Sequence, residues 1–340
     1  MTAGGYFHSL TSTFLVNKKQ ALIASLSDGK FHSGEALAAD LGVSRTAVWK
    51  QMRGFAGYGL DVFRVRGRGY CLSTPLELFD DAAILSAVDA ADRRAITGLE
   101  VFFSTDSTNG QLLQRVGRRG FHGSVAVAEF QSAGRGRRGR HWLSPLGAGI
   151  CMSLAWRFDP QPETLTALPL AAGVAVMRAL RELGLSEASL KWPNDIICNG
   201  SKLGGILLES RSEMAGPCDV VLGIGVNYRL PDSLAAALDQ PVTDICRQLQ
   251  SAPGRNLLCG RIISHALRMF REFARHGFAP FIEQWRRYDG FAGKQARLLL
   301  QDRSYTGKVL GVTDTGMLQM SIRGNTRQFA NGELSLRMVS

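Results

Sequence analysis

The chain has 340 residues, 45% hydrophobic and 20% charged, a globular composition that excludes a disordered or fibrous protein. Its net charge of +11 favours a polyanionic partner, such as nucleic acid, nucleotide phosphate or anionic lipid. A membrane span is not expected, because the longest apolar run, 165–177, is short and contains a proline and a glycine.

The N-terminal extension and the cysteines indicate the compartment. Residues 1–16 are interpreted as a flexible extension, and they contain no Lys or Arg that could begin a signal peptide. The six cysteines are scattered, without a CxxC pair. We therefore expect no disulfide framework or structural zinc, and a cytoplasmic location.

Residues 17–75 read as a small basic domain, with nine Lys or Arg residues and four acids. Helices are predicted at 18–26, from Ser33 to about residue 41, and from Arg45 to about residue 55, with serines as N-caps. The spacing of Ala38, Gly42 and Val48 is typical of a helix-turn-helix. Two short strands around a glycine turn follow at 62–72 and predict a wing.

The third helix and the wing both carry exposed basic side chains, which predicts DNA binding. A winged helix used only for protein contacts is the alternative. The candidate DNA-binding residues are Ser44, Arg45, Thr46, Trp49, Lys50 and Arg53 on the helix, and Arg64, Arg66 and Arg68 on the wing.

Residues 76–290 alternate predicted strands and helices, which indicates a mixed α/β domain within an α+β chain. Strands are expected at 100–103, 124–130, 148–158, 189–192, 196–198, 203–209 and 219–227, and helices at 108–117, 164–183, 255–276 and 279–288. Alternation along 149–158 predicts a sheet with one buried face, and Asn199-Gly200 predicts a hairpin. Residues 291–340 alternate between turn pairs, which predicts a small antiparallel barrel.

Residues 134–140 place four arginines and three glycines between two predicted strands. Glycines let a backbone approach a ligand closely, and guanidinium groups match phosphate and carboxylate oxygens. An anionic ligand is one interpretation. An RNA-binding tail, a solvated basic loop and a dimer contact are the others.

Other short motifs, each taken alone, are weaker evidence for a ligand site than this segment. Lys191 and Lys202 could bracket a second anionic group, and 223–227 could approach a phosphate or ribose. Ser107-Thr108-Asn109 opens a helix and could be a plain N-cap. No nucleophile constellation and no carboxylate cage for a metal is evident. A site built of Arg, Lys, Gly and Asn, without a nucleophile, suits direct attack of a substrate carboxylate on phosphorus. Mg²⁺ would then be carried by the nucleotide phosphates.

Together these motifs resemble a known family. Segments 131–142, 191–195, 201–206 and 223–227 occur in its order, flanked by matches at 31–35, 41–45, 62–70 and 332–337. The chain resembles the bifunctional biotin–protein ligases that also repress the biotin operon. The resemblance implies a winged helix-turn-helix DNA-binding domain at 17–75, a ligase domain of the biotin/lipoate type at 76–290, and an SH3-like domain at 291–340.

The resemblance implies a biotin–[acetyl-CoA-carboxylase] ligase. Biotin and ATP would give biotinoyl-5′-AMP, which would acylate a lysine of a biotin carboxyl carrier protein. When no carrier is available, the adenylate-bound protein would form a homodimer on operator DNA. A ligase with a winged helix that does not bind DNA, a non-catalytic biotin-sensing transcription factor and a lipoate-type ligase are the alternatives.

The resemblance also assigns residues. Lys202, Arg137 and Lys191 are the catalytic candidates. The expected biotin contacts are Ser107, Thr108, Asn109, Gln131, Arg135, Gly136, Arg137 and Lys202, and the expected ATP or adenylate contacts are Gly134, Arg138, Arg140, Trp142, Asn194, Asn227 and Arg337. The sequence departs from the family at His141, where a Lys is common. No Trp lies in 228–255 to stack on adenine, so Pro241 and Val242 are expected to form an apolar wall.

Overall fold

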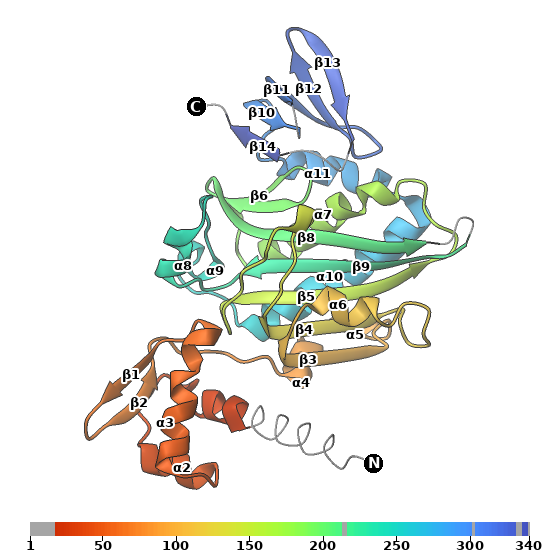
Figure 1. The fold of residues 1–340 in the computed structure, drawn as a ribbon. Coiled ribbons are helices and arrows are strands. Elements are labelled where there is room, and N and C mark those ends of the chain that lie inside the picture. The colour runs from red at the N-terminus through yellow and green to blue at the C-terminus, as the bar shows by residue number, and fades with distance from the viewer. Residues whose placement is uncertain (1–17, 213–215, 301–302, 331–334, 339–340) are drawn as a thin grey trace, which may run out of the picture. The chain divides into compact units, whose positions relative to one another are not determined.

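The computed structural model describes residues 18–212, 216–300, 303–330 and 335–338. The expected extension at 1–16 and part of the motif at 332–337 lie outside these residues. The described chain divides into two compact units (Figure 1). One contains residues 18–78 with Pro145–Gly147, and the other contains Phe79–Ser144 with the residues from Ala148 onward.

The smaller unit has the predicted winged helix-turn-helix elements. They are a helix at 18–26, α2 (Gly34–Asp40), α3 (Arg45–Arg53), the 3-10 turn Phe55–Tyr58, and the antiparallel pair β1 (Val62–Val65) and β2 (Gly69–Leu72). Ser33 and Ser44 are the N-caps, each accepting a backbone N–H three residues on. Gly42 has a φ of +59°, as the turn requires, and Val48 is fully buried.

The larger unit is built on a seven-stranded sheet with the order β3-β4-β5-β9-β8-β7-β6. The strands are β3 (Gly98–Thr105), β4 (Ser124–Gln131), β5 (Gly149–Phe158), β6 (Ala188–Lys191), β7 (Asp195–Cys198), β8 (Ser201–Ser212) and β9 (Cys218–Asn227). Only the β3–β4 pair of this sheet is parallel. The predicted hairpin joins β7 to β8, where Asn199 and Gly200 both have positive φ.

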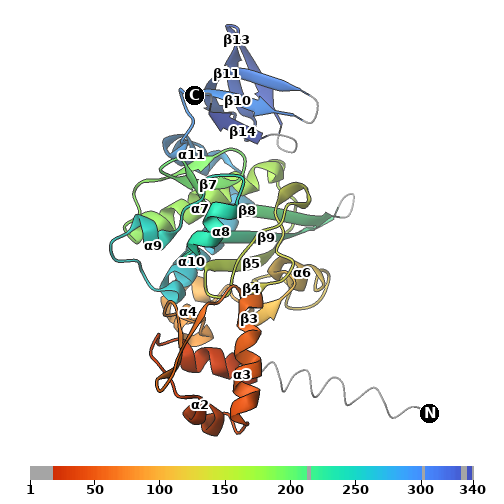
Figure 2. The same cartoon turned by 60° about the vertical axis from the view of Figure 1, so that its left-hand side comes forward.

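Helices cover the sheet on both faces. The larger core lies under α4 (Asp81–Ala87), α7 (Leu168–Glu182), α10 (Arg255–His276) and α11 (Ile282–Tyr288), with α7 and α10 on one side of the sheet in Figures 1 and 2. There Trp156 of β5 stacks on Phe270 of α10 with ring centroids 5.0 Å apart. On the opposite face Ala155 packs in a second core with Leu112 of α6 (Thr108–Leu113).

The prediction of one buried face is therefore wrong. Cys151, Ser153 and Ala155, the alternate residues of β5, are also buried. Their small side chains resemble a solvated face in sequence, but they leave room for α6 and for the cavity described below. Two helix predictions also need correction: α6 ends four residues early, before Gly117 with its φ of +78°, and α3 ends at Arg53.

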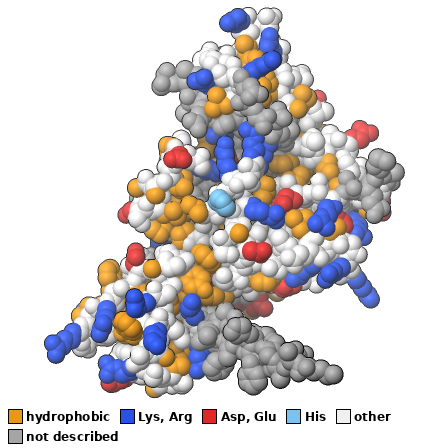
Figure 3. All heavy atoms as spheres, viewed as in Figure 1, with side chains coloured by type: hydrophobic (Ala, Val, Ile, Leu, Met, Phe, Trp, Pro, Cys, Tyr) orange, Lys and Arg blue, Asp and Glu red, His pale blue; other side chains and the backbone are white. Residues whose placement is uncertain are grey.

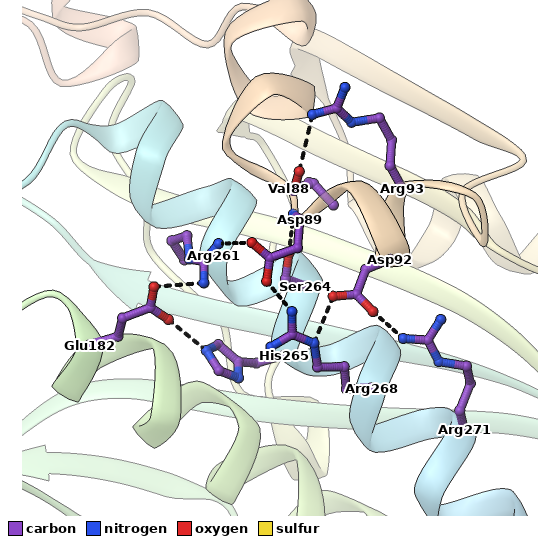
Figure 4. Close-up of polar contacts among 10 residues, drawn as sticks. All are labelled: Val88, Asp89, Asp92, Arg93, Glu182, Arg261, Ser264, His265, Arg268 and Arg271. Atoms are coloured by element: carbon purple, nitrogen blue, oxygen red, sulfur yellow. Dashed lines mark hydrogen bonds and ion pairs between the residues drawn. The ribbon is translucent and has the colours of Figure 1, made fainter.

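The short helices α4 and α5 (Ala90–Arg93) were not predicted, and charged side chains hold α5 in place (Figure 4). Arg261 of α10 pairs with Asp89, the N-cap residue of α5, and lies 2.6 Å from Glu182 of α7. Arg268 pairs with both Asp89 and the buried Asp92. These contacts join α10 to α5 and α7.

The C-terminal segment is a five-stranded antiparallel sheet, as an SH3-like domain requires. Its strands are β10 (Gln295–Leu299), β11 (Ser304–Val312), β12 (Leu318–Ile322), β13 (Asn325–Phe329) and β14 (Ser335–Met338). Its buried side chains join the larger core, and Trp192 Nε1 donates to the Gly316 carbonyl at 3.1 Å. Within the described residues, no helix has the length and apolarity needed to cross a membrane.

Candidate active site

A cavity of about 750 Å³ lies in the larger unit. Its floor includes Gly223 and Gly225 of β9, on the sheet face that carries α6. A Cβ at Gly223 would lie 2.5 Å from Asn109 Oδ1, and one at Gly225 would lie 2.6 Å from the Trp142 ring. Glycine is therefore required at both positions, because these side chains pack directly on the backbone.

The N-terminus of α6 forms one wall. The Thr108 N–H donates to Gln131 Oε1 at 2.8 Å, and Asn109 Nδ2 donates to Glu209 Oε2 at 2.7 Å. Ser107 caps the helix and also lines the cavity, so the two interpretations of this residue are compatible. Ser107, Thr108 and Asn109 are all buried, and their hydrogen bonds to neighbouring side chains fix their positions at the edge of the cavity.

Two polar residues that were not predicted support this wall without lining the cavity. The Ser153 hydroxyl donates to Thr108 Oγ1 at 2.7 Å, and Glu209 accepts from both Asn109 and Arg135. Ser153 stands in the small-residue register of β5, and Glu209 is an acid within an apolar strand. Each was visible as an exception to a strand pattern, but neither exception indicated its partner.

The loop rich in arginine and glycine connects β4 to β5 and borders the cavity. Arg135 Nη1 lies 3.1 Å from Glu209 Oε1, and Arg137 Nη1 donates to Asn194 Oδ1 at 3.2 Å. Burial lowers the pKa of Arg137, and the like charge of Arg138 adds to this effect. A guanidinium in such surroundings is stabilised by an added anion, which favours the anionic-ligand interpretation of the loop.

Two lysines meet at one carboxylate in the cavity. Lys202 Nζ lies 2.7 Å from Asp195 Oδ1, and Lys191 Nζ lies 3.7 Å from Asp195 Oδ2. The Lys202 side chain is 19% exposed, and its ammonium lies 5.8 Å from the Trp142 ring centroid. Asn227 Nδ2 donates to the Lys202 carbonyl at 3.3 Å, so the end of β9 fixes the start of β8.

An apolar wall also borders the cavity. It is formed by side chains around α8 (Asp232–Ala237), a helix that was not predicted: Leu230, Leu234, Leu238, Pro241 and Val242. The expected Pro241 and Val242 are thus part of a larger leucine-rich surface. The segment ends in α9 (Ile245–Gln248), which was also missed.

Most predicted site residues meet in this cavity. The lining includes Ser107, Thr108, Asn109, Gln131, Arg135, Gly136, Arg137, Arg138, Arg140, His141, Trp142, Lys191, Asn194, Lys202 and Asn227. Gly134 is outside the lining, and its Cα hydrogens face the Trp142 carbonyl, which a Cβ would approach to 2.4 Å. Arg337 lies on β14, in register with Arg297 of β10. No group of three His, Cys, Asp or Glu side chains in the described part of the chain could hold a metal ion.

The predicted DNA-binding residues lie in the smaller unit. Ser44 is the α3 N-cap, and the other eight residues, Arg45, Thr46, Trp49, Lys50, Arg53, Arg64, Arg66 and Arg68, are exposed. The Arg53 guanidinium lies 5.1 Å from the Trp49 ring centroid, and Arg68 lies 4.2 Å from the Phe31 ring centroid. Figure 3 shows Lys and Arg side chains gathered over this unit.

Two family models match the chain. The biotin/lipoate A/B protein ligase family matches residues 101–227, and an HTH domain matches residues 18–71. These segments coincide with the cavity strands and the winged helix.

Several known proteins match this chain over nearly its whole length. The bifunctional ligase/repressor BirA of Salmonella typhimurium is 35% identical over 323 residues, covering 93% of this chain and 96% of the relative. The protein of the same name from Bacillus subtilis is 31% identical over 322 residues, covering 92% and 96%. The structure of biotin protein ligase from Aquifex aeolicus in complex with biotin and ATP has a TM-score of 0.61 and 25% identity, covering 71% of this chain and 99% of that chain.

Proposed function

The chain belongs to the biotin/lipoate A/B protein ligase family, and from this premise we propose a bifunctional biotin–protein ligase and DNA-binding repressor. The observation that carries the ligase assignment is the cavity itself. It combines buried hydrogen-bonding groups at the start of α6, an arginine loop, and Lys202 beside Asp195. The DNA-binding assignment rests on the exposed basic residues of α3 and the wing.

In the first step, an oxygen of the biotin carboxylate attacks the α-phosphorus of ATP. The bond between that phosphorus and the oxygen that bridges the α- and β-phosphorus atoms breaks, and pyrophosphate leaves with the bonding electrons. Lys202 contacts the biotin carboxylate and the phosphate, and Lys191, Arg138 and Arg140 contact the ATP phosphates. Catalysis by these cations is positioning and charge stabilisation.

Each substrate has its own part of the cavity. Biotin lies against Ser107, Thr108, Asn109 and Gln131, with Arg135 and Gly136 above it. The nucleotide lies toward Trp142, Asn194 and Asn227, with its adenine against the leucines of the α8 segment. Gly134 lets the loop backbone approach the nucleotide closely. Arg337 is proposed to reach the ATP side of the cavity.

Mg²⁺ is proposed to enter with the nucleotide phosphates. Both oxygens of Asp195 contact lysines, and the described residues hold no group of three metal-binding side chains, so the phosphates themselves would hold the ion. When bound, Mg²⁺ would neutralise phosphate charge during the transfer.

In the second step, the amine of a carrier-protein lysine attacks the acyl carbon of biotinoyl-AMP. The bond between that carbon and the phosphate oxygen breaks, AMP leaves, and the amine proton passes to solvent. The mixed anhydride hydrolyses if water reaches it, so the loop around Arg137 serves as a lid. The acceptor is a biotin carboxyl carrier protein of acetyl-CoA carboxylase.

The same intermediate regulates transcription. When no carrier is available, adenylate stays bound, and the protein dimerises in the cytoplasm and binds a two-fold operator. Adenylate can favour the dimer only if it binds the dimer more tightly. We assign DNA binding to 17–75, ligation to 76–290 and an SH3-like domain to 291–340.

The test is a reaction with ATP, Mg²⁺ and a biotin carboxyl carrier domain, supplied with biotin or with lipoate. The proposal predicts biotin on the acceptor lysine, detected by mass spectrometry, and much slower lipoate transfer. Faster lipoate transfer would reassign the enzyme. Absence of both products from a folded protein would favour a non-catalytic sensor.

A further inference from the structure

A buried arginine lies at the base of the arginine–glycine loop. Arg255, the first residue of α10, is 1% exposed and pairs with Glu129 of β4, which is 4% exposed. Its Nη1 donates to Glu129 Oε2 at 2.9 Å, and its Nη2 donates to the Gly149 carbonyl at 2.9 Å. One guanidinium therefore connects the end of β4 to the beginning of β5.

These two contacts mark the two ends of the loop. The loop leaves β4 after Gln131 and returns to β5 at Gly149. The ladder between these strands ends at the Ala128–Cys151 pair, so Glu129 and Gly149 lie just beyond it. There Arg255 provides a connection that backbone pairing no longer makes. Gln131, which holds Thr108, follows Glu129 by only two residues.

A third contact satisfies the remaining carboxylate oxygen. Glu129 Oε1 accepts the backbone N–H of Phe79, and the Arg255 guanidinium lies 4.0 Å from the Phe79 ring centroid. The next residue, Asp80, donates its N–H to Asn256 Oδ1 at 2.9 Å. The pair is thus enclosed and oriented on several sides, which makes its geometry specific.

We propose that Arg255 and Glu129 are positioning residues that fix both ends of the loop and so determine how tightly it retains the adenylate. The inference rests on the proposed function. A buried ion pair is weak evidence for stability, because desolvation of the two charges offsets their attraction. Anchoring the ends of a flexible loop lowers the ordering cost of closing it over a ligand. Neither residue needs to touch the substrate.

The test measures release of biotinoyl-adenylate from the preformed complex in Arg255→Lys and Glu129→Gln. Each change weakens a charge-assisted hydrogen bond at one loop end while keeping a polar side chain. We expect release to be about tenfold to a hundredfold faster, the change that loss of one such bond corresponds to. Arg261→Lys is the matched control, because Arg261 lies on the same helix and pairs with Asp89 and Glu182. Its release rate should stay within about twofold of the parent.

Limited trypsin digestion supplies a second readout. Cleavage after the loop arginines, followed by mass spectrometry, should accelerate in the adenylate-bound Arg255→Lys and Glu129→Gln proteins but not in the control. The two variants could lose thermal stability and still match the control both in the rate of adenylate release and in the rate of cleavage. That result would show that the pair is only structural, and it would overturn the inference. A parent protein that forms no adenylate would instead contradict the proposed function.

Discussion

The ammonium nitrogen of Lys202 lies 2.7 Å from Asp195 Oδ1, inside the cavity. The two residues come from adjacent antiparallel strands, on either side of the β7–β8 hairpin. The hairpin thus presents a cation whose position is set before any substrate binds. The carboxylate also reaches Lys191, so one acid orients two of the catalytic candidates.

Asp195→Asn should reduce adenylate formation. The amide keeps the shape of the side chain but loses the charge that orients both lysines, so kcat/KM for biotin-dependent ATP–pyrophosphate exchange should fall about tenfold to a hundredfold. Asp314→Asn is the control, because Asp314 is 86% exposed and pairs only loosely with Arg286 at 3.6 Å. Equal exchange by the Asp195→Asn protein and the parent would show that Asp195 has no part in orienting the lysines.

Arg137→Gly should open the lid. The change removes the hydrogen bond to Asn194 and a partly buried guanidinium that an anionic ligand would stabilise. Adenylate release should rise at least about tenfold, and lysines of bystander proteins should become biotinylated. Arg119→Gly, an exposed change away from the cavity, should behave like the parent. Unchanged release from the Arg137→Gly protein would reject the lid role.

Lys50→Ala and Arg53→Ala should weaken DNA binding without affecting ligation. If each side chain neutralises one phosphate, the slope of log affinity against log salt should fall by about one per substitution. Binding to the promoter of the protein's own biotin genes, followed by fluorescence anisotropy with biotin and ATP present, measures this slope. Arg327→Ala, on β13, is the control. If both variants remain active ligases and show the salt slope of the parent, the DNA contacts lie on other residues.

Asp289→Asn should stabilise the protein near neutral pH. Burial raises the pKa of Asp289 to about 6, and Oδ2 has no hydrogen-bond partner among the described residues. Because the folded pKa exceeds the ordinary value of 3.8, the contribution of Asp289 to stability is complete below that value and is lost as the pH rises through about 6. The neutral amide avoids this loss and still accepts the Phe291 N–H through Oδ1.

Urea unfolding across a pH series measures the effect. The gain should reach roughly 1–3 kcal/mol near neutral pH, shrink below about pH 6, and disappear near pH 4. Exposed Asp314→Asn should give a flat difference. A gain for Asp289→Asn that persisted at pH 4 would have another origin.

Sequence patterns predicted the parts of the fold that depend on local rules. Ser33, Ser44, Gly42 and the Asn199-Gly200 turn occupy the expected positions, because caps and positive-φ turns depend on neighbouring residues. Most of the predicted ligand residues also meet in one cavity. Their assembly could be anticipated from motif order and the family resemblance, since four separate motifs had to converge on one site.

Partners distant in sequence could not be predicted. Glu129 interrupts an apolar strand, which signals a buried acid, but nothing in the pattern selects Arg255 among the arginines. The same holds for the ion pair between Glu209 and Arg135, because nothing in the pattern matches this acid to that arginine. The short helices α4, α5, α8 and α9 were missed because a helix of one or two turns has too little periodicity to detect. Their positions depend on tertiary contacts such as Arg261–Asp89.

The most direct measurement of the central claim is mass spectrometry of the purified protein after incubation with biotin, ATP and Mg²⁺ and removal of unbound ligand. The parent and the control Lys308→Ala, whose lysine is exposed on β11, should carry biotinoyl-AMP. Lys202→Ala should carry none while remaining folded. Adenylate on the Lys202→Ala protein would contradict the role given to Lys202, and its absence from the folded parent would contradict the ligase assignment itself.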